Sequence, residues 1–254
     1  MRIGFAGAGN MAAAMARGWA AGPGGPDAML FTDLDQARAV ALAAEVGGET
    51  RTGLESLAAD CDVLLLAVKP AALDAVAEEL GGEAPPLLSV LAVTPTTRIA
   101  AAFPGVPILR VMPNQPVEVR RGVLCHAPAV GMSDGLRDEL LELLEVLGDV
   151  VALDEAHIDA AMAIMSSSPA YIALVAEALA RGGEREGLDP QVAGELVAGA
   201  LAGTAELLRR RDPATIRDTV APPGGATEAG LAQLEGVVED AFVNAVSASL
   251  ERFR

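Results

Sequence analysis

A glycine-rich turn directly after a short apolar run opens the chain, and it constrains the fold more than any other feature. Residues 2–14 read RIGFAGAGNMAAA, so the apolar run 3–6 meets the pattern Gly7-x-Gly9-x-x-Ala12. In a dinucleotide-binding domain the first glycine allows a tight strand-to-helix turn, the second lets backbone approach a pyrophosphate, and the small third residue lets helix and strand pack closely. Taken alone, the pattern also fits a glycine turn in another α/β protein.

The residues that follow supply the context that such a turn needs. Apolar residues at helical spacing predict a helix over 10–21, and a cluster of glycines and prolines ends it. A second strand is predicted over 28–32. Asp33 and Asp35 follow it, about where this fold places its ribose-binding carboxylate. A signal peptide is not expected, because two glycines and an asparagine interrupt the apolar segment.

Composition sets broader limits on what the chain can do. Its 254 residues are 52% hydrophobic, which is enough for a buried core, and no uninterrupted apolar run reaches the roughly 18 to 20 residues of a membrane span. The net charge of −17 argues against nucleic acid or an anionic membrane as partner. The two cysteines and two histidines lack the spacing of a metal site or a disulfide framework. We therefore expect no metal and a reducing cytoplasm as the compartment.

Strand-like and helical segments alternate up to residue 153. This alternation predicts an α/β fold, with an N-terminal Rossmann-type doubly wound and mostly parallel sheet over 1–153. The further strands are expected at 62–68, 87–93, 107–112, 122–126 and 150–153, and the further helices at 96–102 and 133–147.

From residue 154 to 254 the pattern is helical throughout. An acid followed by proline opens helices at Asp189 and Asp212, and the last helix is expected to run from near Thr227 to the C-terminus. Small residues at 194, 198, 199, 202 and 203 would let another backbone come close. We therefore predict an all-α dimerisation domain; an intrachain bundle without a partner is the alternative.

Lys69 is the only lysine, because the other seventeen basic residues are arginines. It follows the predicted strand 62–68 and precedes Pro70, which places it at the carboxyl end of a parallel strand, where open α/β sheets bind ligands. A compact ammonium beside a cofactor would account for the choice of lysine; chance in a biased composition is the alternative.

A second glycine-rich segment, APPGGAT over 221–227, precedes the last predicted helix. Gly224 and Gly225 permit positive φ, so the backbone N–H groups of Gly225, Ala226 and Thr227 could converge on an anion such as a small carboxylate. The alternative is a helix start after a Pro-Gly turn, with Thr227 serving as its N-cap.

Five segments together resemble pyrroline-5-carboxylate reductase, in order and in spacing, over essentially the whole chain. They are GAGNMA at the N-terminus, AVKP around Lys69, RVMPNQP at 110–116, SSPAY at 167–171 and RDTVAPPGGAT at 217–227. The resemblance implies a cytoplasmic enzyme that reduces 1-pyrroline-5-carboxylate to proline with NADPH or NADH, in the last step of proline biosynthesis. It also implies homodimers formed by the helical domain, often assembled further into decamers.

The resemblance also assigns roles to residues. Thr227 is a candidate catalytic residue, since its hydroxyl or a bound water could carry the proton. Asp33 favours NADH because a carboxylate repels a 2′-phosphate, unless Arg38 offsets it; NADPH is the common donor in the family. The expected cofactor-binding residues are Gly7, Gly9, Asn10, Met11, Asp33, Ala67, Lys69, Pro70 and Asn114. The expected substrate-binding residues are Gly224, Gly225, Ala226 and Thr227.

Departures from the family pattern leave the substrate open. A reductase of another cyclic imine and a non-catalytic nucleotide-binding dimer are the alternatives. The related β-hydroxyacid dehydrogenases need a lysine in the helical half, and this chain has none beyond Lys69. The departures are Val93 and Thr94 in place of an Ala-Gly pair, Gln115 in place of threonine, Met165 and Ser166 in place of Ser-Gly, and Pro222 in place of serine.

Overall fold

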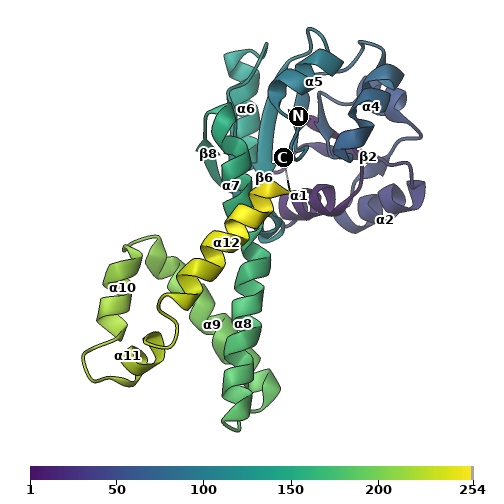
Figure 1. Ribbon diagram of the computed structural model, residues 1–254. Helices are drawn as coiled ribbons and strands as arrows, with labels where there is room; N and C mark the ends of the chain where they lie inside the picture. The colour runs from purple at the N-terminus through teal and green to yellow at the C-terminus, as the bar shows by residue number, and fades with distance from the viewer. Residues whose placement is uncertain (253–254) are drawn as a thin grey trace. The chain divides into compact units, whose positions relative to one another are not determined.

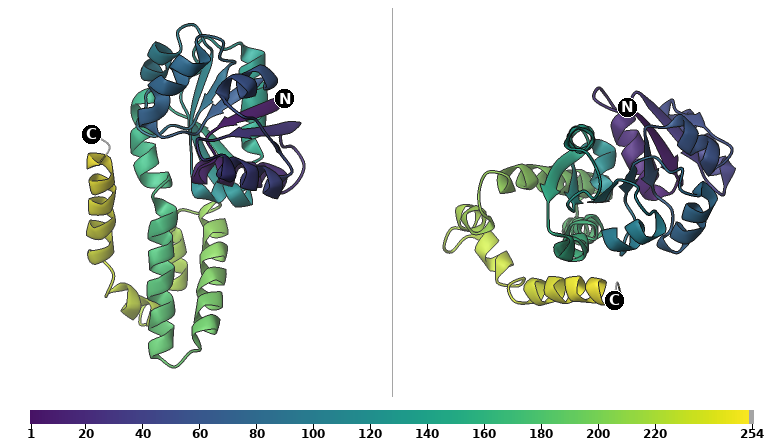
Figure 2. Two further views of the ribbon diagram at one scale, coloured as in Figure 1. Left: turned by 90° about the vertical axis from the view of Figure 1, so that its right-hand side faces the viewer. Right: turned by 90° about the horizontal axis from the view of Figure 1, so that it is seen from above.

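The computed structural model describes residues 1–252, which form two compact units, 1–166 and 167–252. The first unit contains a sheet of eight strands with helices on both faces (Figures 1 and 2). The second unit is made of helices alone. This arrangement confirms the predicted fold class, a doubly wound sheet followed by an all-α region.

The strand order places the change of winding direction between β1 and β4. The order is β3-β2-β1-β4-β5-β6-β7-β8, and every neighbouring pair is parallel except β6 and β7. Such a switch point is where open α/β sheets bind ligands. The strands are β1 (Arg2–Ala6), β2 (Ala28–Thr32), β3 (Glu49–Thr50), β4 (Val63–Leu66), β5 (Leu87–Ser89), β6 (Ile108–Pro113), β7 (Gly122–His126) and β8 (Gly148–Ala152).

Both faces of the sheet are buried, and alternate strand residues contribute to opposite faces. Phe5 and Leu65 belong to the apolar cluster on one face, whereas Ala6 and Leu66 belong to the cluster on the other. Burial on both sides explains why these strands are apolar without a polar alternation. One face is covered by α1 (Asn10–Ala20), α2 (Gln36–Val46) and α6 (Asp134–Glu145), the other by α3 (Leu54–Asp60), α4 (Leu73–Leu80) and α5 (Thr96–Ala102).

Close packing fixes α1 against the rest of this unit. The Trp19 side chain is almost fully buried, and its Nε1 donates a hydrogen bond to the Leu143 carbonyl at 2.9 Å. At Gly18 a Cβ would lie 2.2 Å from the Val117 carbonyl oxygen, so only glycine fits. Arg120 donates hydrogen bonds to carbonyls at the C-terminal end of α1, including that of Trp19. Trp19 is thus a core residue.

The structure contains elements that the sequence pattern did not single out. Among them are α2, α3 and α4, together with the short 3-10 segments η1 (Pro70–Ala72) and η2 (Gln115–Val119); a third 3-10 segment, η3 (Glu155–His157), begins after Asp154, where a helix was expected. Several are short, and α2 is rich in alanine, so their apolar periodicity is weak. Strand β5 is shorter than the expected 87–93 and ends at Ser89.

Helix α7 (Ile158–Met165) packs with the sheet unit, although it lies beyond the last strand. Its residues Ile158, Met162 and Met165 form an apolar cluster with Met112 and Cys125 of β6 and β7. Packing therefore divides the chain after residue 166. The expected boundary at 153/154, which concerns functional domains, stays a prediction.

The helices of the second unit begin largely where their caps were expected. The carboxylates of Asp189 and Asp212 accept hydrogen bonds from Gln191 N at 2.9 Å and Thr215 N at 3.0 Å. The prediction of one continuous final helix is wrong, because a turn ending at Gly236, with φ of +79°, separates two helices. The unit comprises α8 (Ser168–Arg185), α9 (Pro190–Leu208), α10 (Pro213–Val220), α11 (Ala226–Leu231) and α12 (Val237–Glu251).

The second unit buries almost nothing on its own. Within 167–252 the structure assigns one buried residue, Ala193. An apolar groove of about 450 Å³ runs between α8 and α9, lined by side chains such as Ile172, Ala176 and Leu201. Within residues 1–252, the helical stretch Glu155–Arg185 contains an 18-residue window with a mean hydropathy of 1.4, so it is long and apolar enough to cross a membrane by length and composition alone. It is not an uninterrupted apolar run, because Asp159, Glu177 and Arg181 lie within it.

Candidate active site

Three strands of the first unit end level with one another at the switch point. Ala6 of β1 is in register with Leu66 of β4, and Leu66 with Ser89 of β5. The parallel register continues past the ends of the strands, because Ala67 N donates to the Ala6 carbonyl at 2.9 Å and Val90 N donates to the Leu66 carbonyl at 3.1 Å. The turns that follow β1, β4 and β5 therefore lie side by side at the carboxyl edge of the sheet.

Gly7 makes the sharp turn after β1. Its φ is +102°, a region that side chains disfavour, and a Cβ there would lie 2.7 Å from the Ala67 carbonyl oxygen. The Gly7 N–H donates to the Thr32 carbonyl at 2.9 Å, which ties this turn to the end of β2. Both conformation and space therefore require glycine at the first position of the pattern.

Gly9 faces open space at the N-terminus of α1. A Cβ at Gly9 would meet no atom within 4 Å, and the φ of −75° at this residue is compatible with a side chain. Neither conformation nor space within the chain therefore requires glycine here. Helix α1 has no side-chain cap and no acidic residue in its first turn, whereas Ala12 is fully buried. An uncapped helix N-terminus approached over a bare glycine suits a pyrophosphate, so the residues present fit a dinucleotide.

Asp33 lies beside this turn at the end of β2. Its Oδ2 accepts a hydrogen bond from Ala8 N at 2.7 Å and its Oδ1 one from Asp35 N at 2.8 Å. Arg38 in turn pairs with Asp35 at 3.5 Å. A cavity of about 500 Å³ extends along α1 and α2 and is lined in part by Gly9 and Arg38. Arg38 thus borders the same space as Gly9, and Asp33 is hydrogen-bonded to the glycine turn at Ala8.

The turn after β4 presents Lys69 to solvent. Lys69 is exposed and caps η1, which begins at Pro70, while Ala67 is half-buried against the turn at Gly7. The structure thus brings Ala67, Lys69 and Pro70 to the same edge as the glycine turn. Their contact with a cofactor stays a prediction.

Asn114 follows β6 and uses its side chain within the protein. Its Nδ2 donates to the Met165 carbonyl at 3.0 Å, and its Oδ1 accepts from Val123 N at 2.8 Å. Only 7% of Asn114 is exposed. The amide therefore holds the end of β6 against β7 and α7, and its predicted place beside the cofactor is untested.

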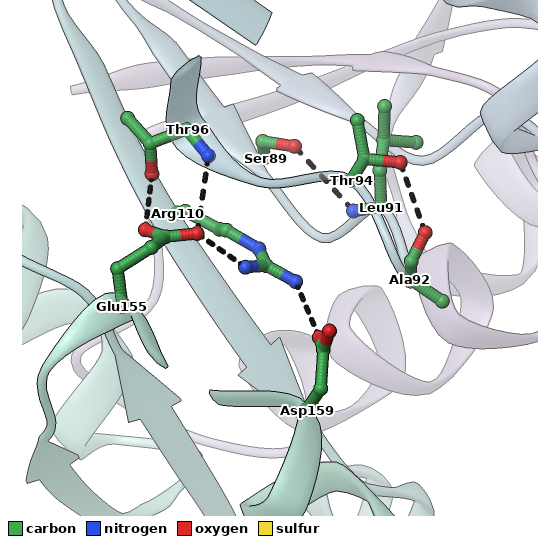
Figure 3. Close-up of polar contacts among 8 residues, drawn as sticks. All are labelled: Ser89, Leu91, Ala92, Thr94, Thr96, Arg110, Glu155 and Asp159. Atoms are coloured by element: carbon green, nitrogen blue, oxygen red, sulfur yellow. Dashed lines mark hydrogen bonds and ion pairs between the residues drawn. The ribbon is translucent and has the colours of Figure 1, made fainter. Parts of the chain in front are cut away.

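A buried arginine, which sequence reasoning did not single out, links β6 to the segment after β8 (Figure 3). Arg110 is 1% exposed and pairs with Glu155 through Nη1 and with Asp159 through Nη2, the latter at 3.1 Å. Thr96, the first residue of α5, donates to Glu155 from its hydroxyl at 2.6 Å and from its backbone at 3.1 Å. The only sequence signal was an arginine inside a predicted buried strand, which must find a partner.

Hydrogen bonding controls the charge of Glu155. Burial by itself raises the pKa of this carboxyl, but the hydrogen bonds donated by Thr96 and by Arg110 outweigh burial and hold the pKa below its ordinary value. Glu155 therefore stays ionised, and it joins α5, β6 and η3 in one polar cluster.

The glycine loop of the second unit differs in detail from the expected anion cup. Gly224 has φ of +77°, as expected, but its N–H donates to the Glu228 carboxylate at 2.7 Å. The Gly225 N–H donates to the Pro222 carbonyl at 2.9 Å, and its predicted contact with an anion stays a prediction. Ala226 and Thr227 open α11, and Thr227 is exposed. A carboxylate does bind a loop amide here, but it belongs to the chain itself.

These features define the class of protein. A doubly wound sheet with a glycine turn, an uncapped α1 and an acidic residue after β2 is the architecture of an oxidoreductase that uses a nicotinamide dinucleotide. A family model described as pyrroline-5-carboxylate reductase dimerisation matches residues 155–254, and one described as NADP oxidoreductase coenzyme F420-dependent matches residues 2–93.

Relatives and solved structures agree on the family. A pyrroline-5-carboxylate reductase of Synechocystis sp. is 39% identical over 75% of this chain and 73% of its own length, and pyrroline-5-carboxylate reductase 2 of Bos taurus is 34% identical over 100% and 83%. The crystal structure of 1-pyrroline-5-carboxylate reductase from Streptococcus pyogenes superposes with a TM-score of 0.89 at 26% identity, over 100% of this chain and 98% of that one. The chain belongs to the pyrroline-5-carboxylate reductase family.

The dimerisation model accounts for the apolar surface of the second unit. The groove between α8 and α9 and the exposed apolar residues of α8, among them Ile172 and Leu179, lie within the matched segment. The chain therefore self-associates through this unit, and the same surface explains why α8 carries apolar side chains without burying any of them.

Replacing Gly9 by valine should weaken nucleotide binding and leave the fold intact. The new side chain would fill the space in front of α1, so we expect the Kd for NADH, measured by fluorescence titration, to rise at least about tenfold, which corresponds to about 1.4 kcal/mol. Gly53→Val is the matched control, because Gly53 also caps a helix and its Cβ position is nearly free. Equal Kd values in the two variants would contradict the assignment.

Glu155→Gln should lower the free energy of unfolding by about 1 to 3 kcal/mol near neutral pH, because Arg110 loses one of its two charged partners. The pKa of Glu155 is lowered in the folded chain, so its contribution is complete above the ordinary value of 4.5 and is lost as pH falls through the lower folded value. Urea unfolding at several pH values should therefore show the difference from wild type shrinking below about pH 4.5.

The control for this measurement is Glu118→Gln, because Glu118 pairs with Arg17 at the surface and should change the free energy of unfolding by less than about 1 kcal/mol. A Glu155→Gln difference that stays constant or grows in acid would show that ionised Glu155 does not stabilise the fold.

Proposed function

We propose that this chain reduces 1-pyrroline-5-carboxylate to L-proline with NADH or NADPH, the last step of proline biosynthesis. The observation that supports this most is the span of the similarity: curated reductases of that name align along the entire chain. The aligned region includes both the nucleotide-binding turn at Gly7 and Gly9 and the loop at 224–227.

The cofactor would be held at the switch point by the first unit. A bound dihydronicotinamide supplies the hydride. The open N-terminus of α1 would receive the pyrophosphate and Asp33 the ribose, since both lie on the β1 and β2 half of the edge. The nicotinamide then belongs to the β4 and β5 half. We propose as cofactor-binding residues Gly7, Gly9, Asn10, Met11, Asp33, Ala67, Lys69, Pro70 and Asn114.

The reaction needs positioning more than charged catalytic groups. The carbon of the C=N bond accepts a hydride, the C=N π electrons move to nitrogen, and nitrogen takes one proton to give the secondary amine. A protonated imine accepts hydride readily, so the chain has to hold the iminium carbon in place and exclude water. We propose that Gly224, Gly225, Ala226 and Thr227 bind the carboxylate, and that the Thr227 hydroxyl or a bound water delivers the proton.

The Glu228 side chain must release Gly224 for this role. Its carboxylate now accepts from Gly224 N at 2.7 Å, so a substrate carboxylate would replace it there. Glu228 is exposed and can move into solvent. The contact supports the assignment, because it shows a carboxylate fitting this loop amide.

We further propose that dimers assemble into decamers in the cytoplasm, away from nucleic acid and membranes. The net charge of −17 supports the absence of nucleic acid and membrane partners, because an acidic chain is repelled by polyanions. We also propose that the functional domains meet at 153/154. Strand β8 ends at Ala152, and the dimerisation model begins at residue 155.

The first test is turnover of 1-pyrroline-5-carboxylate, followed by the loss of dihydronicotinamide absorbance. We expect turnover by the wild type and a fall in kcat/KM of about tenfold or more for Thr227→Ala, equivalent to about 1.4 kcal/mol, with partial rescue by Thr227→Ser. Thr219→Ala is the control, because Thr219 lies on the preceding helix and donates to the Thr215 carbonyl. Nucleotide binding without any turnover would refute the proposed reaction and favour a binding role.

The same assay tests the choice between NADH and NADPH. The Asp33 carboxylate at the end of β2 should repel a 2′-phosphate, so we expect NADH to be preferred and Asp33→Ser to shift the ratio of kcat/KM values toward NADPH. Arg38→Ala tests the alternative, in which Arg38 leaves Asp35 and binds the 2′-phosphate of NADPH. In that case the variant should have a lower kcat/KM with NADPH and an unchanged kcat/KM with NADH. A wild-type preference for NADPH that Arg38→Ala abolishes would reverse the assignment.

Association through the α8 and α9 groove is tested by Ile172→Glu. A charge placed in this apolar groove should break the assembly, and light scattering should then give the 25.8 kDa of one chain. Leu34→Glu is the control, since Leu34 is fully exposed on the first unit. The wild type should have the mass of ten chains; a mass of two chains would reject the decamer and leave the dimer.

A further inference from the structure

The turn after β5 holds a valine in a backbone conformation that valine disfavours. Val93 has φ of +54°, and a β-branched side chain in this left-handed region is strained. Within residues 1–252 the one other non-glycine residue with positive φ is Arg120. The positive φ of Arg120 accompanies guanidinium hydrogen bonds to carbonyls at the end of α1. No comparable bond involves Val93 in the described structure, because its side chain is apolar.

Polar contacts on both sides hold the turn in place (Figure 3). Before it, the hydroxyl of fully buried Ser89 accepts from Leu91 N at 3.4 Å. After it, Thr94 is buried and its hydroxyl donates to the Ala92 carbonyl at 2.9 Å. Two residues further on, Thr96 is held by Glu155. The surroundings therefore impose the strained conformation on Val93, which is the pattern found at ligand-binding sites.

Val93 is also a large apolar side chain that this turn exposes at the edge. Its exposed fraction is 37%, whereas Leu91 and Thr94 are buried. The turn begins at Val90, whose N–H donates to the Leu66 carbonyl, so it lies next to the turn at Ala67 and Lys69. This is the β4 and β5 half of the edge, opposite the half that holds Asp33.

We propose that Val93 is a specificity-determining residue that limits the ring size of the cyclic imine. The inference rests on the proposed function, in which the nicotinamide and the imine carbon meet at this half of the edge. A branched side chain fixed there by its backbone takes up volume that a glycine would leave free. Five-membered rings fit beside it, and six-membered rings meet its methyl groups. A difference of one methylene in such a pocket changes kcat/KM by about 10- to 200-fold.

The test compares two substrates in Val93→Gly and Val93→Ala. The substrates are 1-pyrroline-5-carboxylate and the six-membered 1-piperideine-6-carboxylate, each assayed with saturating NADH. We expect the ratio of kcat/KM, six-membered over five-membered, to rise at least about tenfold in Val93→Gly and less in Val93→Ala. The KM for NADH should stay within about twofold, because the nucleotide half of the edge is unchanged.

Val130→Gly is the matched control. Val130 is also exposed, but it pairs with Ile108 at the start of β6, so it lies at the other end of the sheet. Its substrate ratio should equal that of the wild type.

The outcomes separate this proposal from the proposed function. If the wild type does not reduce the five-membered imine, the proposed function fails. If it does, and the substrate ratio of Val93→Gly matches that of the wild type and of Val130→Gly, the role of Val93 is overturned. If Val93→Gly unfolds more easily than the wild type, the test uses Val93→Ala, which retains a Cβ. A substrate ratio of Val93→Ala equal to that of the wild type then overturns the role of Val93.

Discussion

The candidate site depends on one constraint: the carboxyl ends of β1, β4 and β5 lie in register at the same edge of the sheet. The register of Ala6, Leu66 and Ser89 continues through hydrogen bonds of Ala67 and Val90, so three separate turns meet at one edge. A slip of one residue would move every side chain of the strand to the opposite face of the sheet and separate the turns. The apolar side chains of these strands, buried on both faces, resist such a slip.

Association is the second requirement of this molecule. Helices α8 to α12 bury a single residue within 167–252, so their apolar side chains need a surface from outside the chain. The small contacts inside the unit, such as Tyr171 OH to the Ala245 carbonyl at 3.5 Å, are too weak to replace a core. The stability of this unit is therefore tied to protein concentration, as it is in obligate oligomers.

The sequence predicted the features whose signals are local. The turn at Gly7, the strand 28–32 before Asp33, and the caps at Asp189 and Asp212 each depend on neighbours within a few residues. The links from Arg110 to Glu155 and from Asn114 to Met165 join residues 45 and 51 positions apart, so no local pattern indicates them. The break at Gly236 and the contact of Glu228 with Gly224 also escaped, because a single glycine or glutamate has several ordinary uses.

The placement of the aromatic residues makes the two units optically distinct. The chain has one tryptophan and one tyrosine: Trp19 is buried in the first unit, and Tyr171 packs at 6.2 Å from the Phe242 ring in the second. Tryptophan emission thus follows the sheet unit, and the tyrosine signal that is left after the tryptophan contribution is subtracted follows the helical unit. Denaturation recorded with both signals can reveal whether dissociation and loss of the helical unit precede the melting of the nucleotide-binding unit, without any added label.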